Sequence, residues 1–217
     1  MEFADWLFHK YSSWRGNSRK SVSAFARHLG VSQFTVARWM NGTRASPDDY
    51  TVVVALAHRY PDAYRILGLP LPFGDEVQQL AEAWNDLGED EQVEVLYITG
   101  SGPRPIKSQD AAVFGDWIYQ KFYEWRGRSR SNKYVAQFSG YLGLPNPTVT
   151  QWVNGTRAQP TGYRIIVTLA SKYPEIYSDL GLQLPYCDEI QQIAQVWAGL
   201  ADEKRSQILA IVADSMC

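Results

Sequence analysis

The sequence predicts an all-α protein that is built from one module written twice. Apolar residues recur at the three- and four-residue spacing of a helix, and Gly and Pro separate the segments. The second half of the 217 residues then repeats the order and spacing of the first half. Two domains of about 100 residues are of ordinary size. We therefore expect domains at 1–98 and 113–217, with a linker rich in Gly, Pro and Ser at 99–112.

The centre of each module is a pair of short helices joined by a tight turn. In the first copy an apolar stripe predicts a helix that ends at Gly30, and Ser32 is a suitable N-cap for a second helix over 33–40. A turn of about three to four residues that contains Gly is typical of a helix-turn-helix. The second copy repeats the pattern at 134–155, where Asn146 is the expected cap of the second helix and Pro147 is expected in its first turn. Coinciding positions include Phe25 and Phe138, Leu29 and Leu142, Val36 and Val149, Trp39 and Trp152, and Gly42 and Gly155.

The remaining helices are predicted from apolar stripes on both sides of this centre. An aromatic-rich helix precedes the pair in each copy, two helices follow it, and a hairpin of two helices ends the module. The aromatic side chains are expected to be buried in the core, rather than exposed for stacking on bases. The expected ranges are 2–14, 48–59, 61–68, 75–87 and 90–98 in the first copy, and 114–125, 161–172, 174–181, 188–200 and 202–214 in the second.

The net charge of −2 hides a strong segregation of charge. Residues 1–72 and 114–185 each carry +4, whereas 73–100 carry −8 and 186–217 carry −3. Each copy is thus basic around its helix pair and acidic behind it, which orients a protein on a polyanion. The acidic hairpins are interpreted as solvated faces, or alternatively as a surface for a partner or a homodimer.

Basic residues cluster where a docked helix pair meets a sugar-phosphate backbone. One cluster lies just before each pair, and a nearly identical loop, NGTRASP or NGTRAQP, follows each pair. The alternative interpretations are a solvated loop for the first cluster and a helix C-cap for the Asn-Gly step. The predicted phosphate-binding residues are Arg15, Arg19, Lys20, Ser32, Asn41, Arg44, Arg126, Arg128, Arg130, Lys133, Asn154 and Arg157.

The stretches 22–69 and 135–182 resemble the Cro/C1 (lambda-repressor-like, XRE) helix-turn-helix family. The likeness rests on the apolar spacing, the turn, the cap and the trailing WMNGTR of the first copy, and the repeat extends it to the second. The resemblance implies a DNA-binding fold and transcriptional regulation, in bacteria or their phages. It gives the expected fold as two tandem lambda-repressor-like domains, each with an N-terminal helix and a C-terminal helical hairpin.

In this family the second helix of the pair enters the major groove, so its outward side chains are expected to contact bases. Gln and Asn suit adenine, Arg suits guanine, and Phe or a Thr methyl suits the thymine methyl. Because the two sets differ, we expect two unlike half-sites bound by a single-chain pseudo-dimer, or one reading copy and one that grips backbone. The expected base-reading residues are Gln33, Phe34, Thr35, Arg38, Asn146, Thr148 and Gln151.

Other function classes are disfavoured by the sequence. The three histidines lack zinc-type spacing with the cysteines, and no phosphate loop or nucleophile motif is present, so we expect no enzyme, metal or cofactor. No apolar run reaches the length of a membrane span. Two cysteines indicate a reducing compartment, hence a cytoplasmic protein. The remaining alternative is an adaptor that keeps the fold and binds a protein partner through its acidic hairpins.

Overall fold

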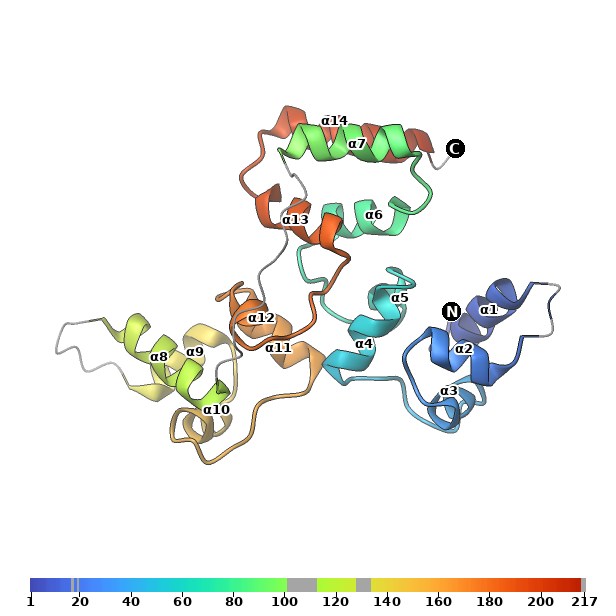
Figure 1. Cartoon of the computed structure of the whole chain (residues 1–217). Helices are drawn as coiled ribbons and strands as arrows, with labels where there is room; N and C mark the ends of the chain where they lie inside the picture. The colour runs from blue at the N-terminus through green and yellow to red at the C-terminus, as the bar shows by residue number, and fades with distance from the viewer. Residues whose placement is uncertain (17, 19, 101–112, 128–133, 216–217) are drawn as a thin grey trace. The chain divides into compact units, whose positions relative to one another are not determined.

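The computed structural model describes residues 1–16, 18, 20–100, 113–127 and 134–215. Within these ranges the chain forms fourteen α-helices and no strand, which confirms the all-α prediction (Figure 1). The helices fall into two compact units. The first unit comprises Met1–Pro105 with Leu184–Cys217, and the second comprises Ile106–Gln183.

Three helices open the first unit: α1 (Phe3–Arg15), α2 (Val22–His28) and α3 (Gln33–Met40). The third begins and ends where the sequence predicts, because Ser32 Oγ accepts the Thr35 amide at 3.1 Å and caps its start. Gly30, with a φ of 69°, takes the left-handed conformation between α2 and α3. The predicted turn between two short helices is therefore present in the first copy.

Aromatic side chains of α1 fill the core of this three-helix group, as the spacing predicted. Trp6 is buried, and Phe3 meets the Trp39 ring edge-on at 5.7 Å. Edge-to-face packing of this kind adds about 0.5–1.5 kcal/mol to the stability given by area burial. This contact fixes the position of α3 through the buried ring of Trp39. The opposite side of α3 remains open to solvent.

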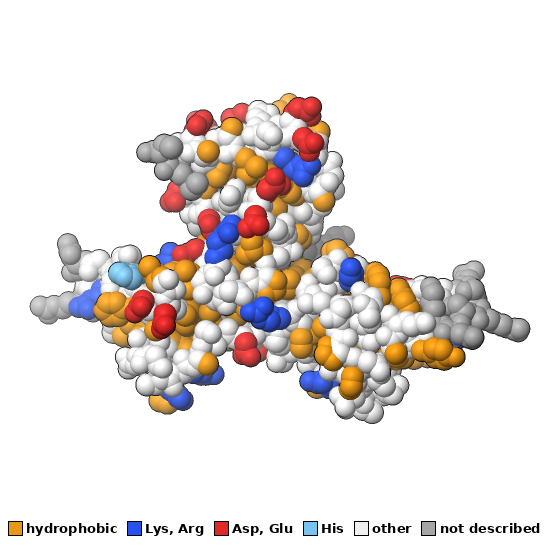
Figure 2. All heavy atoms as spheres, turned by 180° about the vertical axis from the view of Figure 1, so that it is seen from behind, with side chains coloured by type: hydrophobic (Ala, Val, Ile, Leu, Met, Phe, Trp, Pro, Cys, Tyr) orange, Lys and Arg blue, Asp and Glu red, His pale blue; other side chains and the backbone are white. Residues whose placement is uncertain are grey.

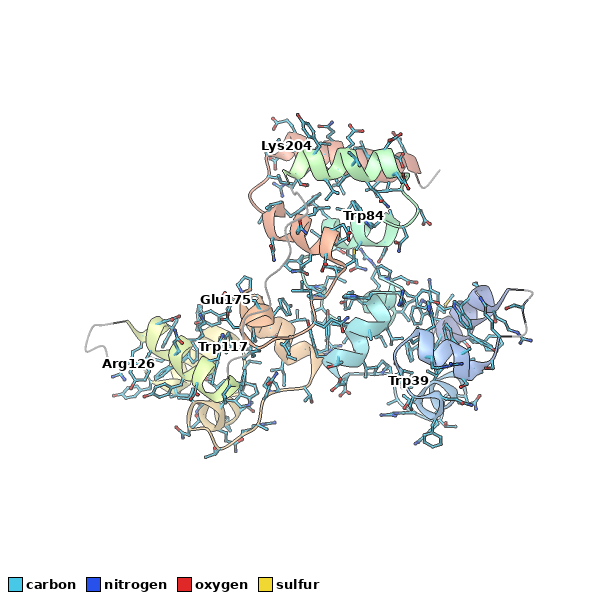
Figure 3. All side chains as sticks on the ribbon, viewed as in Figure 1. Trp39, Trp84, Trp117, Arg126, Glu175 and Lys204 are labelled. Carbon is cyan, nitrogen blue, oxygen red and sulfur yellow. The ribbon has the colours of Figure 1, made fainter. Side chains whose placement is uncertain are left out.

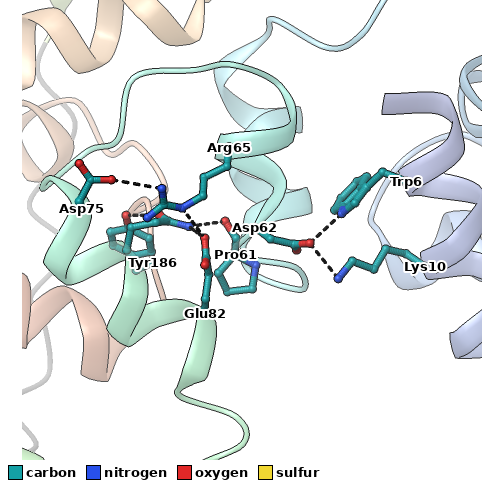
Figure 4. A network of polar contacts seen from close by, with 9 residues as sticks. Trp6, Lys10, Pro61, Asp62, Arg65, Asp75, Glu82 and Tyr186 are labelled. Atoms are coloured by element: carbon teal, nitrogen blue, oxygen red, sulfur yellow. Dashed lines mark hydrogen bonds and ion pairs between the residues drawn. The ribbon is translucent and has the colours of Figure 1, made fainter. Parts of the chain in front are cut away.

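Helices α4 (Tyr50–Ala57) and α5 (Ala63–Ile66) follow. Pro61 lies in a turn before α5, and not in its first turn as predicted, because the helix begins two residues later. Asp62 links this segment to α1, since it accepts the Trp6 indole N–H at 2.7 Å and pairs with Lys10 at 3.0 Å (Figure 4).

Four helices from the two hairpins form what we call the hairpin cluster: α6 (Asp75–Ala83), α7 (Glu89–Thr99), α13 (Asp188–Trp197) and α14 (Asp202–Ser215). Each hairpin packs more closely on the other hairpin than its own two helices pack on each other. An apolar core forms because each hairpin covers the apolar side of the other. Its buried members include Val77, Leu80, Trp84, Val95, Ile98, Ile190, Ile193, Trp197, Ile208 and Val212.

Polar contacts between the hairpins fix their register. The Trp197 indole N–H donates to Glu76 Oε2 at 2.8 Å, and Lys204 Nζ donates to the Ile98 carbonyl at 3.2 Å, at the end of α7 (Figure 3). A cationic group at a helix C-terminus is favourable for the helix dipole. Because of this packing, the compact units do not coincide with the two sequence repeats. Residues 184–217 belong to the second copy in sequence but are part of the first unit.

The second unit contains α8 (Phe114–Arg126), α9 (Val135–Leu142), α10 (Asn146–Val153), α11 (Tyr163–Ala170) and α12 (Ile176–Asp179). The ion pair of the first unit recurs here between Lys121 and Glu175 at 2.8 Å, but the Trp117 indole donates to Asp179 at 2.9 Å and not to Glu175, the counterpart of Asp62.

The start of α10 differs from the prediction. Asn146 was expected to cap this helix, but it is the first helical residue, because Pro145 occupies the cap position with a φ of −58°. Its side-chain oxygen instead accepts a hydrogen bond from Thr150 Oγ1 at 3.2 Å. Pro147 still lies in the first turn, where its missing N–H has no intrahelical partner to lose.

Candidate nucleic-acid interface

The outer side of α3 is open to solvent. Gln33, Phe34 and Arg38 are exposed, Thr35 is half-buried, and Val36 and Trp39 are turned into the core. Helical periodicity separates these two sets, since residues of the inner stripe recur at three and four positions. All four predicted base-reading residues of the first copy thus lie outside the core.

The loop that follows α3, residues 41–47, is held against this helix by its arginine. We call it and its counterpart at 154–160 the arginine loops. Arg44 Nη1 donates to Thr35 Oγ1 at 3.1 Å, and its guanidinium carbon lies 5.9 Å from the centre of the Trp39 ring. Ser32 Oγ also donates to Thr35 Oγ1, at 2.8 Å. The Arg44 cation is therefore held beside the start of α3 by a hydroxyl group and an aromatic ring.

The second arginine of this surface is also fixed. Arg38 Nη2 donates to the Thr43 carbonyl at 3.3 Å, and the guanidinium carbon lies 5.4 Å from the centre of the Phe34 ring. A planar guanidinium held in this way has lost part of its conformational freedom before any ligand arrives. The other N–H groups of Arg38 are oriented by these contacts with α3 and with the arginine loop.

The second unit repeats the arginine loop almost atom for atom. Arg157 Nη1 donates to Thr148 Oγ1 at 3.2 Å, and its guanidinium carbon lies 5.8 Å from the centre of the Trp152 ring. Asn146 and Gln151 are exposed on the same helix. Gln151 occupies the position of Arg38, however. Helix α10 and its arginine loop therefore contain one arginine, Arg157.

The predicted phosphate contacts flank these helices unevenly. Arg15 and Lys20 are exposed between α1 and α2, where Arg15 Nε donates to the Ser18 carbonyl at 3.1 Å and Lys20 lies 4.6 Å from the Trp14 ring centre. Arg126 is half-buried at the end of α8. Ser32, Asn41 and Asn154 are exposed. The predicted contacts Arg19, Arg128, Arg130 and Lys133 lie outside the described residues.

Positive charge around the first helix pair also acts on a histidine. Burial against the aromatic core lowers the pKa of His28, and the nearby charges of Arg59 and Lys20 lower it further. His28 stacks on Trp14 with ring centres 5.4 Å apart. The neutral imidazole therefore fits this position better than the charged form.

Sequence reasoning missed the groups that shape the arginine loops. Thr43 Oγ1 donates to the Arg38 carbonyl at 3.2 Å, and Thr156 Oγ1 donates to the Gln151 carbonyl at 3.1 Å. The indole N–H groups of the two core tryptophans donate to loop carbonyls: Trp39 to Ala45 at 3.0 Å and Trp152 to Ala158 at 3.1 Å. The near-identity of the loops was the signal, because a shared hydrogen-bond pattern accounts for the Thr as well as the Arg in both loops.

The part of the chain that the structure describes contains no group of three or more His, Cys, Asp or Glu residues arranged to hold a metal ion, and no helix with the length and hydropathy of a membrane span. Acidic side chains are spread over the hairpin cluster (Figure 2). Exposed examples are Asp86, Glu89, Asp90, Glu94, Asp202 and Glu203.

Comparison of the chain with protein-family models, with curated proteins and with solved structures finds no match. The repeated geometry of the two helix pairs and their loops is therefore the main indication of function.

Proposed function

We propose that this protein binds double-stranded DNA in a sequence-specific manner and regulates transcription as a single-chain pseudo-dimer. In this proposal α3 and α10 each enter a major groove, and the arginine loops contact the flanking phosphates. The resemblance to the Cro/C1 helix-turn-helix family supports this reading of the two helix pairs.

One observation carries the proposal: each copy places an arginine of the loop against a threonine on the outer side of the second helix. The Arg44–Thr35 and Arg157–Thr148 distances are 3.1 and 3.2 Å. The two copies have drifted in the helix residues themselves, yet both keep this pair. A cation fixed beside an exposed helix is what phosphate contact next to base readout requires.

Pairing of the hairpins supports the pseudo-dimer. Dimeric proteins of this class place two reading helices on two half-sites through an interface between chains. Here the second hairpin packs on the first within one chain, so two reading helices are linked without a second molecule. The second binding event is then intramolecular and benefits from a high effective concentration.

Selection of bound sequences from a random double-stranded DNA library tests the proposal. The full chain is expected to select a bipartite site with two unlike halves. Gln33→Ala and Arg38→Ala should each weaken binding to the selected site by about 1–3 kcal/mol and relax preference in one half only. Gln79→Ala serves as the matched control, because Gln79 is exposed on α6 and lies outside the proposed interface.

Two results would contradict the proposal. Recovery of no preferred sequence would exclude specific readout. A site with a single half, bound equally well after disruption of α10, would exclude the pseudo-dimer and leave only the first helix pair as a reader.

A protein-binding adaptor is the second candidate, and one surface of α7 favours it. Tyr97 and Val93 are 86% and 64% exposed on this helix, and the exposed carboxylates Asp90 and Glu94 lie within one to two turns of them. The corresponding positions on α14, Ala210 and Ser206, are small. Unchanged DNA binding by the Gln33→Ala and Arg38→Ala variants, together with loss of a protein complex in Tyr97→Ala, would favour the adaptor.

A further inference from the structure

We infer that Phe34 and Arg38 together form a subsite for a methylated pyrimidine next to a guanine. This inference rests on the proposed function and goes beyond it by naming the bases of one step in the first half-site. The pyrimidine is thymine, or equally 5-methylcytosine, since both carry a methyl group at C5.

The two side chains lie on one side of α3, one helical turn apart, and touch each other. The Arg38 guanidinium carbon lies 5.4 Å from the centre of the Phe34 ring, within the distance of a cation–π contact. The Phe34 side chain is 70% exposed, so its ring retains most of its apolar surface for a ligand. One exposed phenylalanine by itself does not indicate a binding site. Its contact with Arg38, however, places an apolar ring beside a group of hydrogen-bond donors.

The chemistry of this pair matches adjacent base edges in the major groove. A guanidinium fork donates to guanine O6 and N7, and an apolar ring contacts the C5 methyl group of a pyrimidine. The contact between Phe34 and Arg38 favours two bases that are neighbours. The Thr43 carbonyl holds one guanidinium nitrogen at 3.3 Å and so limits the directions in which the others point.

The second copy lacks both members of the subsite. Pro147 and Gln151 occupy the corresponding positions on α10, where neither an aromatic ring nor a guanidinium is available. The paired subsite for a methylated pyrimidine and a guanine is therefore specific to the half-site that α3 reads.

Substitution of single bases in the selected duplex tests the inference. Replacing the thymine next to the guanine by uracil removes only the methyl group. Wild-type affinity should fall about fourfold, the value expected for one buried methyl group. Replacing that T·A pair by 5-methylcytosine·G should preserve more affinity than replacing it by unmodified C·G.

Matched variants assign the effect to the proposed residues. In Phe34→Ala the thymine-to-uracil difference should disappear, which is the signature of direct coupling in a double-mutant cycle. Phe8→Ala is the control, because Phe8 is also exposed, at 54%, but lies on α1. It should retain the full uracil effect. Arg38→Lys should lose preference for the adjacent guanine, since an ammonium lacks the fork.

The outcomes separate this inference from the proposed function. Specific binding with no uracil effect in either half overturns the subsite and leaves DNA recognition intact. A uracil effect that persists in Phe34→Ala assigns the methyl contact to another residue and also overturns it. Absence of any selected sequence overturns the proposed function, and the subsite falls with it. Thermal melting of Phe34→Ala should match the wild type, because the side chain is exposed.

Discussion

Tyr186 donates a hydrogen bond from its hydroxyl group to Gln78 Oε1 at 2.7 Å, inside the hairpin cluster. Tyr186 precedes α13 and Gln78 lies on α6, so the bond joins the second copy to the first. The Gln78 amide nitrogen meanwhile donates to the Pro61 carbonyl and to Glu82 (Figure 4). The repeat places Phe73 and Gln191 in the corresponding positions, and Phe73 has no hydroxyl group to offer.

The first prediction follows from this asymmetry. Gln191 is only 1% exposed, and its Oε1 atom has no hydrogen-bond partner among the described residues. Phe73→Tyr should supply the missing donor and raise the free energy of unfolding by about 1 kcal/mol. Tyr186→Phe should lower it by about 1–3 kcal/mol, because Gln78 then loses its partner. Urea denaturation measures both. A loss of stability in Phe73→Tyr would show that the two sides are not equivalent.

The second prediction concerns the link between the two hairpins. Glu76→Ala removes the acceptor of the buried Trp197 indole and should cost about 1–2 kcal/mol of unfolding free energy. The nearby Arg205, at 3.8 Å from Glu76, adds little because the contact is long and partly solvated, and because Arg205 also pairs with Asp202. Glu189→Ala is the matched control: both residues are second in their helices, so both variants lose the same dipole interaction. Equal costs in chemical denaturation would refute a special role for Glu76.

The third prediction is a dependence of stability on pH. Because the pKa of His28 is below its ordinary value of 6.5, the unfolded chain binds a proton first as the pH falls. Stability is therefore full above about 6.5 and declines below it. His28→Tyr should weaken this decline, and the second copy shows that Tyr fits, since Tyr141 packs on Trp125 with ring centres 5.9 Å apart. Melting temperatures at several pH values check this, and an identical pH profile in the variant would contradict it.

The fourth prediction tests the arginine loops. Arg44→Ala and Arg157→Ala should each weaken binding across all DNA sequences and reduce the slope of log affinity against log salt by about one. Thr35→Val keeps the cation but removes its anchor, so it should weaken binding less than Arg44→Ala. Titration of a fluorescent duplex at several salt concentrations measures these effects. An unchanged salt slope in both arginine variants would place the loops away from the phosphates.

The fifth prediction concerns a thiol at the base of the hairpin cluster. Burial raises the pKa of Cys187 to about 11, so little thiolate is present near neutrality. In a Cys217→Ser background the remaining thiol should react with iodoacetamide much more slowly in the native protein than in urea. Equal rates in the two conditions would mean that α13 opens freely from α6.

Local features of the helix pairs could be predicted from the sequence, because local chemistry determines them. Gly30 as a stop fixed the end of α2, and Ser32 as a cap fixed the start of α3. The start of α10 was misjudged by one residue, because Pro145 itself takes the cap position. Pro61 was misplaced for a related reason: a proline suits the turn before a helix as well as its first turn.

The partner of each hairpin could not be predicted. Apolar stripes on α6 and α13 show that both must be covered, but a stripe carries no information on what covers it. Trp84 and Trp197 could be buried within their own hairpins or against the other hairpin, and the second arrangement is observed. The deciding contacts, such as Tyr186 with Gln78, join residues 108 positions apart, and no local pattern specifies such a pair.

The hairpin cluster has a consequence for synthesis of the chain. Its first two helices leave the ribosome long before the helices that cover them, since the Trp197–Glu76 contact spans 121 positions. Until α13 and α14 have been translated, the apolar sides of α6 and α7 have no native cover. The nascent chain thus depends on these two later helices, and a premature stop before α13 would leave an aggregation-prone fragment even though both helix pairs had been translated.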